Sequence, residues 1–208
     1  MNRGEKFDRI DFALPGARDD GEDGDDGAGD EDGDDVLVVP PGMASDLSVL
    51  SGRWAWPIDP RGIKRLGDSV TDSRPGKHRP HQGLDIYANA GARVYAAASG
   101  QVLRVVDGRK SENKAQRRAG LFVDILTAPD GNGSRWIHRY LHLGTVRALV
   151  KAQQVAAGDP IGEVAQPHTS GLAAEPHLHF EAREMQADRS YGQPVDPRGY
   201  FPPLTERT

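Results

Sequence analysis

The sequence contains no cysteine, which excludes disulfides, thiolate metal sites and cysteine nucleophiles. Aromatic residues make up only 6% of the chain. No apolar run approaches the roughly 18 residues of a membrane-spanning helix, so we expect no membrane span. Any catalysis must therefore use His, Asp, Glu, Ser, Thr or Tyr side chains.

Charge is divided unevenly along the 208 residues. Residues 1–35 hold 14 acidic and 4 basic side chains, whereas residues 36–208 hold 17 acidic and 22 basic ones. Residues 19–35, DDGEDGDDGAGDEDGDD, combine mutually repelling charges with flexible glycines, which predicts a disordered acidic linker. A calcium loop starting at Asp30 is disfavoured, because Asp35 stands where that loop needs glycine and Pro41 where it needs glutamate.

The segment ahead of the linker shows no secretory signal peptide, because charged residues separate Phe7, Ile10 and Phe12. The export route is therefore left open. Residues 1–18 are either a segment that docks to a partner protein or particle, or a disordered end. We predict an N-terminal segment over 1–53, one domain over 54–203 and a tail over 204–208.

From Trp54 onward, short apolar runs alternate with turn residues, which predicts strands. The predicted strands are Arg93–Ala98, Gln101–Val106, Leu121–Thr127, Arg135–Leu143, Pro160–Val164 and His177–Arg183. Pro129–Gly133 (PDGNG) predicts a hairpin turn, and residues 146–153 are the one candidate helix. This pattern favours an all-β fold, an antiparallel sheet or sandwich.

The seven histidines include two spacings typical of metal sites. His81 stands four residues before Asp85, and His177 stands two residues before His179. Alternation puts His177, His179 and Glu181 on one face of their strand. In the predicted strand over 135–143, it likewise puts four residues on a common face: Trp136, His138, Tyr140 and His142. Catalytic zinc needs three nitrogen or oxygen ligands and one open position, which two histidines and one aspartate would supply. A further group must then take a proton from water.

Three segments together resemble the signatures of peptidase family M23, the lysostaphin and LytM-like peptidoglycan endopeptidases. They are His81-Gln-Gly-Leu-Asp85, Tyr140-Leu-His142-Leu143 and Pro176-His-Leu-His-Phe-Glu181. The resemblance covers about residues 54–203. It implies an all-β fold with a groove that holds one zinc ion, bound by His81, Asp85 and His179, and no other cofactor. It also implies that His142 and His177 are catalytic.

By the same resemblance, the chain is expected to be a zinc endopeptidase that cuts peptide bonds in peptidoglycan stems or cross-bridges. Its site of action would be the cell wall, the periplasm or the extracellular space. One alternative is a non-enzymatic LytM-like module that binds the wall or a partner. Another is a wall-degrading component of a phage tail or injection-type particle. Nucleic acid is not an expected partner, because the basic residues are not interleaved with aromatics.

Several other residues have more ordinary interpretations. Glu181 is expected to orient a neighbour or pair with an arginine, rather than to act as a base. His138 either lines the groove with His142 or is a partly buried core residue. His78 is expected to be exposed, and His168 has no assigned role.

Two loops differ from those of many relatives. Asp107–Gly120 is long and carries five cations, and Ala165–Pro176 is longer and differently composed than the usual turn before the His-Leu-His motif. Such loops form the groove walls in this family. The basic loop either holds acidic wall polymers or is a solvated surface, and the bond that is cut is left open.

Overall fold

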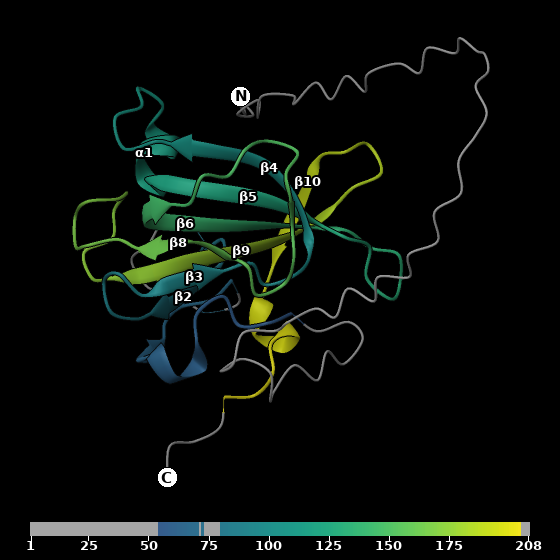
Figure 1. Cartoon of the computed structure of the whole chain (residues 1–208), viewed down its shortest axis with the longest axis horizontal. Coiled ribbons are helices and arrows are strands. Elements are labelled where there is room, and N and C mark those ends of the chain that lie inside the picture. Colours follow the sequence, from purple (N-terminus) through teal and green to yellow (C-terminus); the bar gives the residue numbers. More distant parts are fainter. Residues whose placement is uncertain (1–53, 71, 73–79, 205–208) are drawn as a thin grey trace, which may run out of the picture. The chain divides into compact units, whose positions relative to one another are not determined.

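The computed structural model describes residues 54–70, 72 and 80–204 (Figure 1). The candidate docking segment 1–18, the acidic linker 19–35 and His78 lie outside the described residues, as does the rejected calcium loop.

Short strands dominate the described chain, which confirms the predicted all-β fold. Ten strands and one six-residue α-helix are joined by turns and two short 3-10 helices, and all the strand pairs are antiparallel. In chain order the elements are η1 (Pro60–Gly62), β1 (Arg65–Leu66), β2 (Leu84–Tyr87), β3 (Arg93–Tyr95), β4 (Gly100–Asp107), α1 (Lys114–Ala119), β5 (Leu121–Thr127), β6 (Trp136–Val146), β7 (Gln154–Val155), β8 (Pro160–Val164), β9 (His177–Met185), β10 (Tyr191–Val195) and η2 (Pro197–Tyr200). None of the described helices is long and apolar enough to cross a membrane.

The strands form one sheet in the order β1-β2-β9-β6-β5-β4-β7, in which β9 also pairs with β10, and β8 pairs with β6 and β3. Figure 1 shows β9, β6, β5 and β4 stacked in this order, with α1 at one end of β4 and β5. On one side of β9, β2 pairs with residues 177–180, and on the other side β6 pairs with residues 179–184. Every histidine of the motifs therefore comes from these three strands or from the segment that leads into β2.

The predicted strands over 121–127 and 160–164 are observed with those bounds, and the other four predicted strands are observed with shifted ends. The prediction of a helix over 146–153 is wrong, because Val146 ends β6 and a turn follows. The α-helix forms instead inside the basic loop. Asn113 caps its start by accepting bonds from the amides of Ala115 and Gln116, and Gly120 ends it at a φ of 72°.

Strand alternation separates an apolar face of β9 from a polar one. Leu178, Phe180 and Ala182 are fully buried in the main core. Trp54 closes this core: its ring stacks on Tyr200 with centroids 4.2 Å apart and meets His138 edge-on at 4.3 Å. The opposite face of β9 carries the polar residues of the candidate site.

Candidate metal centre

The register of β2 against β9 places Asp85 directly opposite His179. Asp85 Oδ1 lies 2.8 Å from His179 Nδ1. His81, in the segment that leads into β2, has Nε2 3.0 Å from His179 Nδ1 and 3.2 Å from Asp85 Oδ1. Gly83 lets this segment approach, because a β-carbon there would lie 2.3 Å from the carbonyl oxygen of Phe180. The structure therefore brings the three predicted ligands together in one cluster.

The three ligand atoms have the spacing of a zinc site. Zinc bonds of about 2.0–2.1 Å in tetrahedral geometry put neighbouring ligand atoms about 3.3 Å apart. The observed edges of 2.8, 3.0 and 3.2 Å make a triangle close to one face of that tetrahedron. Two imidazole nitrogens and one carboxylate oxygen also match the donors that zinc prefers. These residues fit a zinc ion with one coordination position left for water.

The electrostatics of the cluster favour a charged Asp85. Burial alone would raise the pKa of Asp85, but hydrogen bonds with His179 and His81 outweigh it and hold this pKa well below its usual range. For His179, burial is outweighed by hydrogen bonds with Asp85 and Glu181, which raise its pKa to about 9. The charge of Asp85 thus favours a positive charge beside it, which a metal ion would supply.

Glu181 lies behind His179, on the side away from Asp85. Its Oε1 is 3.5 Å from His179 Nε2, while its Oε2 accepts hydrogen bonds from Arg139 at 3.2 Å and Arg183 at 3.0 Å. Carboxylates in this position commonly fix the orientation of a metal-binding imidazole. Glu181 thus contacts both a histidine and two arginines, which are the two interactions expected of it.

A row of alternating charges continues from Glu181 across the sheet. Arg104, Asp124, Arg139 and Glu181 are successive register partners on β4, β5, β6 and β9. Asp124 is fully buried and accepts from Arg104 at 2.7 Å and from Arg139 at 3.0 Å. Sequence reasoning missed this row, although a charge inside an apolar strand such as LFVDILT is the signal that could have revealed it, because such a charge needs a partner.

His177 lies beside the ligand triangle, with Nε2 3.6 Å from Asp85 Oδ1. Its Nδ1 lies 2.8 Å from the carbonyl oxygen of Glu175. Because a carbonyl only accepts, we assign the proton to Nδ1, which leaves Nε2 of the neutral ring as a proton acceptor.

An arginine connects two neighbours of His177. The ring of Tyr87 lies 5.1 Å from that of His177, and the Arg65 guanidinium lies 3.3 Å above the Tyr87 centroid. Arg65 also bonds Glu175 at 3.1 Å. Arg65, Tyr87 and Glu175, which we call the His177 clasp, were not found from sequence, since none stands at a metal-site spacing.

His142 reaches the site through an irregularity in β6. Trp136 and Tyr140 point into the main core, yet the His142 ring lies 5.0 Å from that of His177 and 5.9 Å from that of His179. The prediction that all four alternating residues of β6 share a face is therefore wrong at His142. Its φ of 61° and the adjacent register shifts move the alternation by one residue, so that Leu143 returns to the core.

The irregularity also separates the roles of two histidines. His138 is fully buried in contact with Trp54 and Phe180, so of the two alternatives left open for it the structure supports the core residue, more deeply buried than expected. Burial, together with the charges of His179 and His177, lowers the pKa of His142 to about 3, so His142 is neutral near pH 7. His168 is exposed and lies outside this cluster.

Comparison with known protein families gives a match to peptidase family M23 over residues 79–197, more than half of the chain. No curated protein gave a match.

Among solved structures, the catalytic domain of lysostaphin, an antimicrobial peptidase from Staphylococcus simulans, superposes with a TM-score of 0.51 at 22% identity, covering 65% of this chain and 90% of that domain. A zinc-containing peptidase from Vibrio cholerae gives 0.52 at 25% identity, covering 71% of this chain and 40% of that one. Csd3 from Helicobacter pylori gives 0.51 at 23% identity, covering 76% and 37%. These likenesses show a shared fold, and the chain spans less than half of the last two proteins.

Proposed function

Since this chain belongs to peptidase family M23, we propose that it is a zinc-dependent endopeptidase that hydrolyses peptide bonds in the stems or cross-bridges of bacterial peptidoglycan. Its site of action would then be the cell wall. One observation carries the proposal: two imidazoles that are free of the ligand set, His142 and His177, lie beside the triangle of His81, Asp85 and His179.

The proposed chemistry divides between the ligands and the two free imidazoles. The triangle would hold the zinc ion, whose Lewis acidity would serve to activate water and to polarise a carbonyl. His177 Nε2 carries the lone pair in the assigned tautomer, so it can accept a proton from the attacking water and return it to the leaving amine. His142, which is neutral and faces His177, can hydrogen-bond the oxygen on which negative charge develops.

The test is mass spectrometry of fragments released from purified peptidoglycans with different cross-link chemistry. The zinc-loaded protein is compared with its His177→Ala variant, whose zinc content is measured in parallel. We expect the variant to keep zinc and to lose turnover by about 10²- to 10⁴-fold, the usual size of a general-base effect. New fragments from the unmodified protein alone support the proposal and identify the bond.

Two results would contradict the proposal. No fragments from zinc-loaded protein on any wall would favour the non-enzymatic binding module. Full activity of the His177→Ala variant would leave hydrolysis in place but would refute the role assigned to His177.

A further inference from the structure

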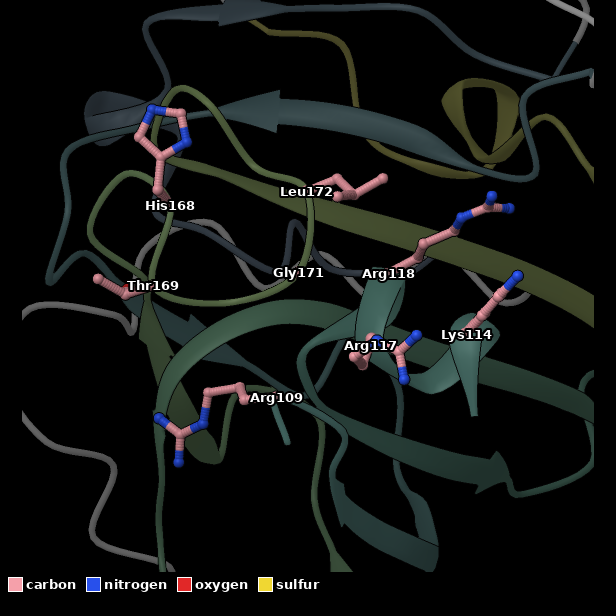
Figure 2. A pocket seen from close by; sticks show the side chains of 8 residues that line it. All are labelled: Arg109, Lys114, Arg117, Arg118, His168, Thr169, Gly171 and Leu172. Atoms are coloured by element: carbon pink, nitrogen blue, oxygen red, sulfur yellow. The ribbon is translucent and has the colours of Figure 1, made fainter. Parts of the chain in front are cut away.

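A basic pocket of about 540 Å³ lies between the loop after β4 and the loop before β9. Figure 2 shows that its cations come from the first loop and α1, and its remaining residues from the second loop. The pocket is lined by Arg109, Lys114, Arg117, Arg118, His168, Thr169, Gly171 and Leu172. None of these residues belongs to the metal centre.

Two of the four Lys and Arg side chains that line the pocket already bond to groups of their own loop. Arg109 forms a bidentate pair with Asp107, which neutralises it. Arg117 uses one nitrogen to bond the backbone carbonyls of Ser111 and Glu112, so it holds the loop in shape. Lys114 and Arg118 make no side-chain hydrogen bond or ion pair within the described part of the chain, although their side chains line the pocket.

Lys114 and Arg118 are exposed cations that lie close together on α1. They stand four residues apart on α1, a spacing that makes side chains neighbours and makes like charges repel. Figure 2 shows both extending from α1 in the same direction. An anion in the pocket would relieve this repulsion.

The pocket shares a wall with the candidate active site. A β-carbon on Gly171 would lie 2.5 Å from His142 Nδ1 and 2.3 Å from the carbonyl oxygen of Arg118, so only a glycine fits between them. The two segments are also bonded to each other, since the Leu172 amide donates to the carbonyl oxygen of Arg118 at 3.4 Å. An occupant of the pocket would therefore lie next to His142.

We propose that the basic pocket is a substrate subsite that binds a free carboxylate of the wall peptide near the scissile bond, with Lys114 and Arg118 as the binding cations. This inference rests on the proposed function and deepens it. The shared wall at Gly171 favours a group attached to the peptide being cut over a separate wall polymer. The subsite makes the enzyme selective for stems with free, rather than amidated, carboxylates.

The test uses one purified cross-linked wall peptide in two forms, with its stem carboxylates free or converted to amides. The zinc-loaded protein is expected to cleave the free form with a kcat/KM about tenfold higher, because charge-assisted hydrogen bonds are lost with the amide. Arg118→Gln and Lys114→Gln are expected to reduce this preference and Arg118→Lys to keep most of it. Arg147→Gln, an equal charge change at an exposed position outside the pocket, is the matched control.

Binding of both peptide forms is measured in parallel on zinc-loaded His177→Ala protein, with and without the pocket substitutions. Cleavage without any preference between the two forms would overturn the subsite and leave the proposed function standing. Carboxylate-dependent binding without cleavage by the unmodified protein would support the subsite and overturn the proposed hydrolysis. The proposal would also be overturned if a glycerol-phosphate polymer bound the pocket more tightly than the free-carboxylate peptide does and lost this binding in the Arg118→Gln variant.

Discussion

Asp85 and His179 lie directly opposite each other on β2 and β9, although 94 residues separate them in sequence. The same register sets Tyr87 opposite His177. A slip of one residue would turn one strand's side chains to the other face, so the candidate centre and the apolar core depend on the same pairing. The strand register thus fixes two of the three predicted ligands, and the third, His81, comes from the segment that leads into β2.

Removing one corner of the triangle is expected to abolish metal binding. We expect His81→Ala to lower the zinc content from about one ion per chain to near zero and to abolish hydrolysis, because two remaining ligands hold zinc poorly. Metal analysis after dialysis measures this directly. His168→Ala, an exposed histidine outside the triangle, is the control and should retain zinc. Stoichiometric zinc in His81→Ala protein would refute the ligand set.

Glu181 is expected to strengthen zinc binding through His179. Replacing the carboxylate with an amide in Glu181→Gln removes the charge that orients and polarises the imidazole, so the zinc dissociation constant should rise about 10- to 100-fold. Chelator competition measures this change. Glu184→Gln is the matched control on the same strand, because the Glu184 side chain bonds Ser134 rather than a histidine. Equal zinc affinity in both variants would contradict the role of Glu181.

The His177 clasp is expected to affect turnover without affecting metal binding. Tyr87→Leu removes the ring between Arg65 and His177, and we expect kcat to fall about tenfold through misplacement of the imidazole. Tyr87→Phe keeps both ring contacts and should retain most activity. Zinc content should be unchanged in both. A loss of zinc that parallels the loss of kcat would show that Tyr87 acts on the ligand triangle instead.

His138 is expected to make the fold sensitive to acid. Burial lowers its pKa to about 3, and neither ring nitrogen has a hydrogen-bond partner among the residues that the structure describes. A histidine in an unfolded chain has a pKa of about 6.5, so below that pH the unfolded state binds a proton that the folded state does not. The free energy of unfolding therefore falls as pH decreases from about 6.5 toward 3, by about 2–3 kcal/mol at pH 4.5 from this residue.

Urea unfolding of the unmodified protein and His138→Phe at pH 7.0 and 4.5 measures this contribution. The variant should lose about 2–3 kcal/mol less stability between the two pH values. Any packing cost of the larger ring cancels, because it is present at both pH values. An equal loss in both proteins would contradict a buried, neutral His138.

The sequence by itself determined the fold class and the candidate ligands. Alternating apolar runs separated by turn residues predicted the antiparallel sheet, and they gave the bounds of β5 and β8. Through their resemblance to the M23 signatures, the three motifs predicted His81, Asp85 and His179 as ligands and His142 and His177 as catalytic residues. The structure brings these five residues together, and their roles stay predictions.

Only the tertiary structure decided the features that depend on strand register and on backbone irregularity. The positive φ of His142 breaks the alternation of β6, so periodicity placed this residue on the wrong face. The charge row from Arg104 to Glu181 and the His177 clasp depend on pairing between distant segments. The wall that Gly171 forms between His142 and the basic pocket arises from contact between two loops. No local pattern encodes such contacts, because they form only when the sheet brings those segments together.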